Sequence, residues 1–256
     1  MAGMLILKTG STYPDIRQQY GDFDRWFCAR LEQSQQTVVT DVTHEQLPGE
    51  PSDWQGIVVT GSPAMVTDQE PWSEKTAAWL HEAVRQQVPV LGVCYGHQLL
   101  AHALGGRVGF RSRGRESGTF EVSCTREGRQ DPLLGQLPPS FPAHLTHAQS
   151  VLELPPGAML LATSDGEPHQ AFRIGPHAWG VQFHPEFTEA VMTAYLNTQA
   201  KGLAEEGQDP GYLLNTVRPT PEATSLIARF EAYASSQTRA TAEMPDNRSG
   251  IAQDTY

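Results

Sequence analysis

The positions of apolar residues along the chain predict strands that alternate with helices. Unbroken apolar runs at 57–59 and 88–93 indicate strands buried on both faces. Residues 14–31 instead carry apolar side chains three and four positions apart, a spacing typical of a helix. This alternation predicts an α/β protein with a mostly parallel central sheet covered by helices.

The pattern changes at about Gly118, after which the predicted strands are shorter. The predicted segments are strands at 5–7, 38–42, 57–59 and 88–93, helices at 14–31, 72–86 and 97–104, shorter strands at 120–124, 145–151, 159–163, 170–174 and 179–183, and two closing helices, the second with Thr220 as N-cap and Pro221 at its first position. Residues after 236 are polar and lack periodicity. We therefore expect one domain over 1–236 and a disordered tail over 237–256.

Composition limits the classes of partner. At 256 residues, 39% of them hydrophobic, the chain is long enough to bury a sizeable core. Its net charge of −11 argues against nucleic acid or an anionic membrane as a partner, because both require clustered Lys and Arg. No apolar run approaches the ~20 residues that span a bilayer. Residues 1–9 lack the features of a secretory leader, so we expect a cytoplasmic protein.

The sequence gives no support for a metal or a cofactor. The three cysteines, Cys28, Cys94 and Cys124, are widely spaced and odd in number, a pattern that gives no disulfide framework and no CxxC metal site. Neither a G-x-x-x-x-G-K-[ST] nor a G-x-G-x-x-G phosphate loop is present, and no histidine pair has metal-protease spacing. We expect a protein that needs no cofactor.

One cysteine stands where a predicted strand turns into a predicted helix. Cys94 follows the apolar run 88–93 and has Gly92 and Gly96 two residues to either side. This is the pattern of a nucleophile elbow, in which small residues allow a tight turn that presents the nucleophile above the sheet. The N-terminus of the following helix favours a thiolate. We therefore predict Cys94 as a nucleophile, and expect Cys28 and Cys124, which lack such glycines, to be structural.

A base for this nucleophile is predicted downstream. His184 and Glu186 flank Pro185, which favours an extended backbone at the residue before it. Residues two apart in an extended segment share a face, so Glu186 can accept the imidazole N–H and leave the other ring nitrogen for a thiol. A bare His-x-Glu is also common in surface turns, so this hypothesis depends on the cysteine turn in the same chain. His97 is a weaker candidate, because the sequence does not fix its direction.

The turn that follows the strand at 57–59 predicts an oxyanion hole. Strand ends gather at one edge of a doubly wound sheet, so the backbone N–H of Ser62 is expected to face that of Tyr95. Two such donors stabilise the oxyanion of a tetrahedral intermediate. An ordinary strand-to-loop turn is the alternative for this segment.

Together, these segments resemble the class I (triad) glutamine amidotransferase family. The features that match are Gly92-Val93-Cys94-Tyr95-Gly96-His97-Gln98, Gln182-Phe183-His184-Pro185-Glu186 and the upstream Thr60-Gly61-Ser62-Pro63. The resemblance implies a flavodoxin-like three-layer α/β/α fold, a Cys94–His184–Glu186 triad, and hydrolysis of the glutamine side-chain amide through a γ-glutamyl thioester. It also implies that Gln98 contacts glutamine, that Gly61 belongs to the oxyanion turn at the substrate, and that 146–149, with His147 and Gln149, holds the amino-acid end.

Two departures bear on the function that the resemblance implies. Many members have two glycines where this chain has Gly61-Ser62; a serine backbone still donates. No synthetase domain or ATP motif follows, so we expect a stand-alone branch, similar to the glutaminase part of GMP synthase and to γ-glutamyl peptidases. The leading hypothesis is an amidotransferase that passes ammonia to an acceptor or partner protein. The alternatives are a γ-glutamyl peptidase or hydrolase, a binding module with an inactive triad, and a cysteine hydrolase of a family that lacks the downstream His-Pro-Glu.

Overall fold

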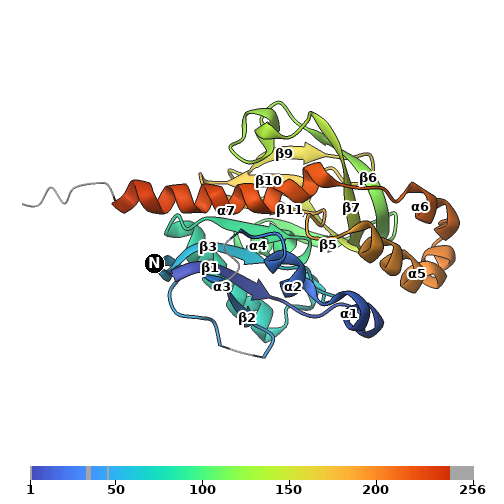
Figure 1. The fold of residues 1–256 in the computed structure, drawn as a ribbon, viewed down its shortest axis with the longest axis horizontal. Helices are drawn as coiled ribbons and strands as arrows, with labels where there is room; N and C mark the ends of the chain where they lie inside the picture. Colours follow the sequence, from blue (N-terminus) through green and yellow to red (C-terminus); the bar gives the residue numbers. More distant parts are fainter. Residues whose placement is uncertain (1, 33–35, 45, 243–256) are drawn as a thin grey trace, which may run out of the picture.

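The computed structural model describes residues 2–32, 36–44 and 46–242. Nine of the described strands form one sheet in the order β2-β1-β3-β4-β11-β10-β9-β6-β7 (Figure 1). The first five run parallel: β2 (Val38–Asp41), β1 (Ala2–Lys8), β3 (Trp54–Val59), β4 (Val90–Val93) and β11 (Ala178–Val181). Their order is the flavodoxin-like 2-1-3-4-5 arrangement, which confirms the predicted fold class.

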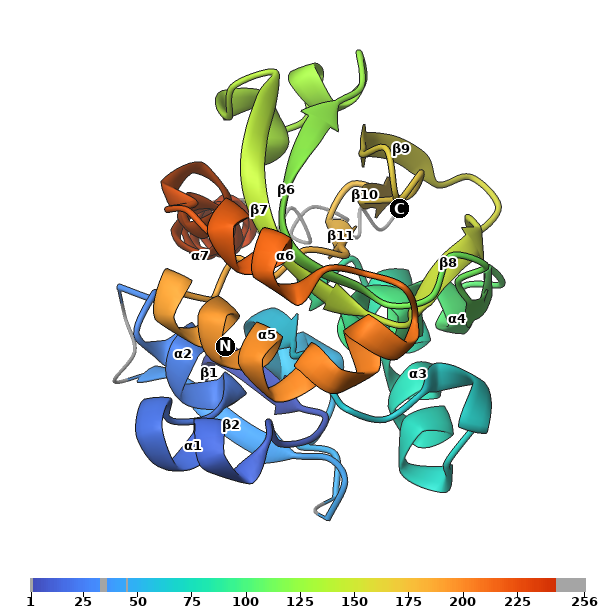
Figure 2. The ribbon, with the colours of Figure 1, turned by 90° about the vertical axis from the view of Figure 1, so that its right-hand side faces the viewer.

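Alternate residues of the parallel strands pack into two separate cores. Met4 and Ile6 of β1 pack on one face of the sheet, and Leu5 and Leu7 pack on the other. The first face is covered by α2 (Phe23–Cys28) and α7 (Pro221–Ala242), the second by α3 (Pro71–Arg85) and α4 (Tyr95–Ala103) (Figure 2). Strands covered on both sides carry apolar residues at every position, which is why these runs lack polar alternation.

The second half of the chain extends the sheet with antiparallel strands. These are β10 (Ala171–Ile174), β9 (Met159–Thr163), β6 (Glu116–Cys124) and β7 (Ser140–His147). A separate antiparallel pair joins β5 (Arg107–Phe110) to β8 (Gln149–Glu153). Helices α5 (Glu189–Glu205) and α6 (Pro210–Thr216) lie beyond the carboxyl ends of the parallel strands (Figure 1).

The prediction of one helix over 14–31 was wrong. The chain forms α1 (Pro14–Tyr20) and α2, separated by Gly21 and Asp22. Gly21 has φ of 86°, which ends α1, and the Asp22 carboxylate accepts the N–H of Phe23, which begins α2. Asp22 also pairs with Lys8 at 2.9 Å, so a contact with β1 fixes the break that the apolar spacing alone did not reveal.

Other elements also differ from the prediction, and β5 was not predicted at all. The expected strand at 145–151 is two strands, because the chain turns at Ala148 and passes from β7 in the large sheet to β8 in the small one. Within the described residues three helices, rather than two, close the fold, since Asp209 caps an additional short helix, α6. Helix α7 continues to Ala242, so residues 237–242 of the predicted tail are helical. The remainder of that tail, 243–256, lies outside the described residues.

Candidate active site

Cys94 occupies a sharp turn between β4 and α4. Its backbone has φ of 50° and ψ of −100°, a conformation rare for a residue other than glycine. A Cβ on Gly92 would lie 2.4 Å from the Gly96 carbonyl oxygen, and one on Gly96 would lie 2.4 Å from that of Val59. The two glycines therefore permit a contact between strand and helix that no side chain would allow, as predicted for a nucleophile elbow.

The His184 imidazole is paired with Glu186 as predicted, but through a different backbone shape. The ring Nδ1 lies 2.7 Å from Glu186 Oε1, and the two side chains are 2% and 0% exposed. The backbone is a turn in which the Phe187 N–H donates to the His184 carbonyl at 3.4 Å, so the expected extended segment was wrong. The turn also stacks the ring of Phe187 on His184, with 4.1 Å between centroids.

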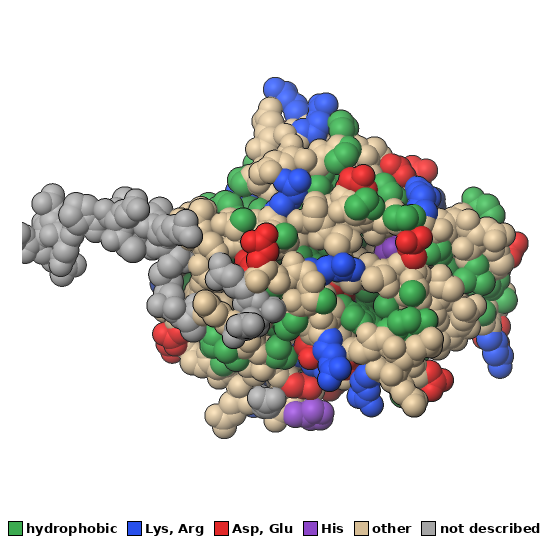
Figure 3. Space-filling model, viewed as in Figure 1, with side chains coloured by type: hydrophobic (Ala, Val, Ile, Leu, Met, Phe, Trp, Pro, Cys, Tyr) green, Lys and Arg blue, Asp and Glu red, His purple; other side chains and the backbone are tan. Residues whose placement is uncertain are grey.

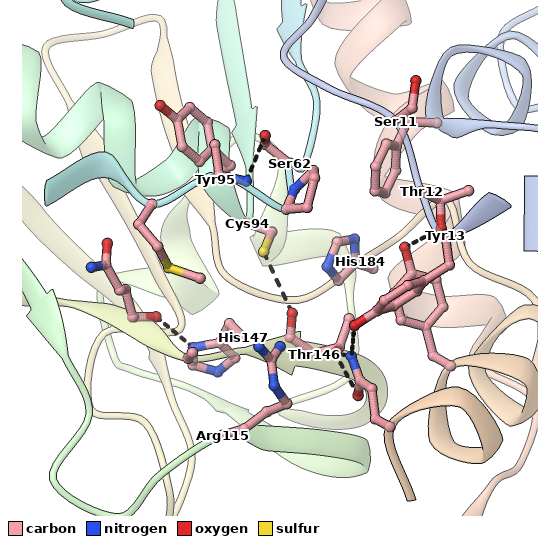
Figure 4. Close-up of a pocket in the computed structure, with 18 of the residues that line it drawn as sticks. Ser11, Thr12, Tyr13, Ser62, Cys94, Tyr95, Arg115, Thr146, His147 and His184 are labelled. Carbon is pink, nitrogen blue, oxygen red and sulfur yellow. Dashed lines mark hydrogen bonds between the residues drawn. The ribbon is translucent and has the colours of Figure 1, made fainter. Parts of the chain in front are cut away.

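The His184 ring nitrogen that does not pair with Glu186 is Nε2, and it lies on the side of the ring near Cys94. His184 Nε2 is buried and has no hydrogen-bond partner among the described residues. A Cβ on Gly61 would lie 3.0 Å from His184 Cε1 and 3.8 Å from Cys94 Cβ, so both side chains reach the same point. Figure 4 shows the Cys94 sulfur and the His184 ring facing one another across the pocket.

The electrostatics of this group favour a charged imidazole. Burial by itself lowers the pKa of His184, but the negative charges of Glu186 and then of Cys94 more than offset it and raise the pKa to about 10. The raised pKa of His184 favours an imidazolium at neutral pH.

The backbone N–H groups of Ser62 and Tyr95 lie near Cys94 and are the predicted oxyanion-hole donors. The Gly61 carbonyl oxygen lies 3.0 Å from the Thr9 hydroxyl, and a trans peptide directs the following N–H, that of Ser62, the opposite way. The Cys94 carbonyl accepts the Gln98 N–H, so the Tyr95 N–H points out of the start of α4. In the described part of the chain neither N–H donates a hydrogen bond.

These groups line a pocket of about 280 Å³ at the carboxyl edge of the parallel strands (Figure 4). Its size is near the lower end of the range for small-molecule sites, about 300–1,000 Å³. The lining residues are 11–14, Phe23, 62–65, Cys94, Tyr95, Gln98, Arg115, 146–149, His184, Tyr195 and Gln199. The pocket therefore includes every residue predicted for the site except Glu186, which lies behind His184, and Gly61, which lies against its ring.

The predicted substrate-binding side chains are tied to one another at the wall of the pocket. The Gln149 carbonyl accepts from Gln98 Nε2 at 2.7 Å and from His147 Nδ1 at 2.8 Å. The second nitrogen of His147 lies 3.0 Å from Glu116, so both its ring nitrogens are engaged by the protein. The buried Gln149 Oε1 has no partner among the described residues, which leaves it as an acceptor.

Other candidates from the sequence lie outside the pocket. The His97 ring packs against Phe172, 5.0 Å between centroids, and burial lowers its pKa to about 3. Burial likewise raises the pKa of the Cys28 and Cys124 thiols, which keeps them protonated. Among the described residues no group of three or more His, Cys, Asp or Glu side chains is placed to hold a metal ion. None of the described helices has the length and apolar character that a membrane crossing requires.

Several pocket residues were not predicted from the sequence. Arg115 reaches the pocket from the segment just before β6, and Tyr195 and Gln199 reach it from α5; neither part of the chain contains a recognisable motif. Gln199 donates to Thr146 Oγ1 at 3.0 Å, and the Thr146 carbonyl oxygen lies 3.8 Å from Cys94 Sγ. These positions depend on how α5 packs across the strand ends, which local spacing does not encode.

Comparison with known proteins identifies the family that the chain resembles. The family model described as glutamine amidotransferase class-I matches residues 19–201. A GMP synthase [glutamine-hydrolyzing] of Thermomicrobium roseum is 40% identical over 131 residues, which are 51% of this chain and 23% of that protein. Gamma-glutamyl peptidase 3 of Arabidopsis thaliana is 28% identical over 185 residues, which are 69% of this chain and 74% of that protein.

The fold has close counterparts among solved structures. A glutamine amidotransferase from Thermotoga maritima has a TM-score of 0.70 at 21% identity, covering 91% of this chain and 97% of the other. The family model covers more than half of the chain, and the solved structure shares its fold. The chain belongs to the class-I glutamine amidotransferase family, and the part that matches covers less than a quarter of the length of the Thermomicrobium GMP synthase.

Gly61→Ala tests the fit of the turn after β3 against the His184 ring. The added Cβ would lie 3.0 Å from His184 Cε1, so the ring has to shift by a few tenths of an ångström from its place beside Cys94. We expect amide hydrolysis, measured as kcat/KM, to fall about 10- to 100-fold, because a small misplacement of a catalytic group is costly. The matched control is Gly202→Ala on α5, where an added Cβ meets nothing within 4 Å. Unchanged activity in Gly61→Ala would contradict this arrangement.

Proposed function

We propose that the protein hydrolyses the side-chain amide of glutamine and releases ammonia, with Cys94 as nucleophile, His184 as acid and base, and Glu186 as its orienting partner. The observation that carries the proposal is the strained turn at Cys94 with the buried His184–Glu186 pair beside it. Backbone strain of this kind is retained where surrounding packing imposes it, and it clusters at active sites.

The first half of the reaction forms a thioester. The Cys94 thiolate attacks the side-chain carbonyl carbon, and the resulting oxyanion accepts hydrogen bonds from the Ser62 and Tyr95 N–H groups. His184 then gives its Nε2 proton to the amide nitrogen, the C–N bond breaks and ammonia leaves. Glu186 holds the other ring nitrogen throughout, which keeps Nε2 aimed at the reacting atoms.

The second half regenerates the thiolate. Neutral His184 takes a proton from water, the hydroxide adds to the γ-glutamyl thioester, and the same two N–H groups stabilise the second oxyanion. Collapse expels the Cys94 thiolate and releases glutamate, while His184 again carries two protons. Ammonia is then available to an acceptor, which we propose to be a partner protein with its own synthetase site.

A γ-glutamyl peptidase is the second candidate. The observation in its favour is coverage: the aligned part is 74% of gamma-glutamyl peptidase 3 but 23% of the Thermomicrobium GMP synthase. The bond broken is again one between a γ-carbonyl and nitrogen, so the same residues serve. The two functions differ in the leaving group, an amino acid or peptide in place of ammonia.

Turnover of glutamine and of γ-glutamyl dipeptides, measured side by side, separates the two functions. A higher kcat/KM on glutamine with release of ammonia supports the amidotransferase, and a higher value on a dipeptide supports the peptidase. Cys94→Ala should lower kcat by at least about 10⁴-fold on either substrate, since loss of a nucleophile costs that much in comparable enzymes. The matched control is Cys124→Ala, which should keep full activity. Retained activity in Cys94→Ala rules out the proposed nucleophile.

The pH profile tests the pairing of His184 with Glu186. Because the pKa of His184 is raised to about 10, its imidazolium persists up to that pH. On the alkaline side of the profile, kcat/KM should therefore fall as pH rises through about 10. In Glu186→Gln the negative charge that raises the pKa is gone, so this alkaline limb should move to lower pH and neutral-pH activity should fall by about 10²–10⁴. An alkaline limb at the same pH in both proteins would contradict the pairing.

A further inference from the structure

One charged side chain in the pocket has no role in the reaction just described. Arg115 lines the pocket, and it is the sole Lys or Arg among the lining residues, which include neither Asp nor Glu. Within the described ranges its guanidinium makes no ion pair or hydrogen bond. In Figure 4 it lies at the side of the pocket that carries Thr146 and His147, away from Ser62 and Tyr95.

The backbone at Arg115 is held from both sides. Its N–H donates to Glu206 Oε2 at 2.7 Å, and its carbonyl accepts from Gln208 Nε2 at 2.6 Å. Gly114 has φ of 74°, and a Cβ there would lie 2.4 Å from Glu206 Oε2. Because Gly114 has no side chain, Glu206 at the end of α5 can approach this segment. The backbone that carries the Arg115 side chain is therefore held in place by hydrogen bonds.

The neighbouring acids are committed to other groups. Glu116 Oε2 accepts from Arg111 at 3.2 Å and from His147 at 3.0 Å, and Arg111 also pairs with Glu167 at 3.1 Å. The Glu206 carboxylate is used by the Arg115 backbone. On the face drawn in Figure 3, several Lys and Arg side chains lie near one another at the top of the view, and others lie among Asp and Glu elsewhere. Arg115 therefore gives a positive, unneutralised wall to a pocket in a protein of net charge −11.

We propose that Arg115 binds a carboxylate of the substrate and makes the pocket selective for γ-glutamyl compounds that carry one. This inference rests on the proposed function, since it assumes that the amide carbonyl lies at Cys94. The planar guanidinium matches a carboxylate with two parallel hydrogen bonds. A γ-glutamyl compound offers two sources of that group: the α-carboxylate of the glutamyl unit, and the carboxylate of a leaving amino acid.

Four substrates distinguish these sources in the wild type and in Arg115→Gln. They are glutamine, glutamine α-amide, γ-glutamylethylamide and γ-glutamylglycine. If the α-carboxylate is bound, the variant loses about 10- to 100-fold in kcat/KM on all but the α-amide, the usual loss for a hydrogen bond to a charged group. If the leaving-group carboxylate is bound, only γ-glutamylglycine suffers this loss. Arg115→Lys should keep more activity than Arg115→Gln, because lysine keeps the positive charge but cannot form the two parallel hydrogen bonds of a guanidinium.

Arg113→Gln is the matched control, because Arg113 is exposed and does not line the pocket. It should behave as wild type on all four substrates. An equal loss on all four substrates in Arg115→Gln, or no loss on any, would overturn the inference.

Binding separates this inference from the proposed function. Calorimetric titration of glutamate and γ-glutamylglycine into the Cys94→Ala protein measures binding without turnover. Adding Arg115→Gln to this protein should weaken the affinity for one or both ligands by the same factor of about 10 to 100 that is expected for kcat/KM. If the wild type hydrolyses none of the four substrates, the proposed function fails, while a loss of binding still supports Arg115. If hydrolysis occurs and neither rate nor binding depends on Arg115, this inference alone fails.

Discussion

The backbone of Cys94, with φ of 50° and ψ of −100°, lies in a region that costs a non-glycine residue about 1–3 kcal/mol. The core around it supplies that energy. Strand β4 is hydrogen-bonded between β3 and β11, and Gly92 and Gly96 let α4 lie against the strand and against Val59. The turn is thus imposed from the centre of the fold, and it sets the thiol above the carboxyl edge of the sheet.

The remaining groups reach the thiol because of strand order. The segments after β3 and β11 flank the end of β4, so the Ser62 N–H and the His184 ring come to Cys94 from its two sides. Each is oriented by a partner outside the pocket. The Thr9 hydroxyl donates to the Gly61 carbonyl, whose peptide carries the Ser62 N–H, and Glu186 Oε1 pairs with His184 Nδ1. The site is therefore preorganised by hydrogen bonds that involve no substrate, which is what stabilisation of a developing oxyanion requires.

The sequence predicted those features whose cause is local. Glycines two residues from Cys94 and the spacing of His184 and Glu186 are local signals. Cys94 and His184 do line the pocket, and Glu186 pairs with His184 behind it. Features set by distant contacts were missed or misjudged. The break at Gly21-Asp22 depends on Lys8, and the position of Arg115 depends on Glu206 and Gln208. The His184 segment shows both cases, since its pairing was predicted while its turn was not.

The central claim is that Cys94 carries the γ-glutamyl group during turnover. The most direct test is to react the protein with a glutamine analogue whose amide nitrogen is replaced by a diazomethyl group, and to locate the adduct by intact mass and peptide mapping. The account predicts one adduct per chain, on Cys94, that glutamine protects against and that Glu186→Gln slows. An adduct on Cys28 or Cys124, or an unmodified Cys94 in a protein that hydrolyses glutamine, would contradict it.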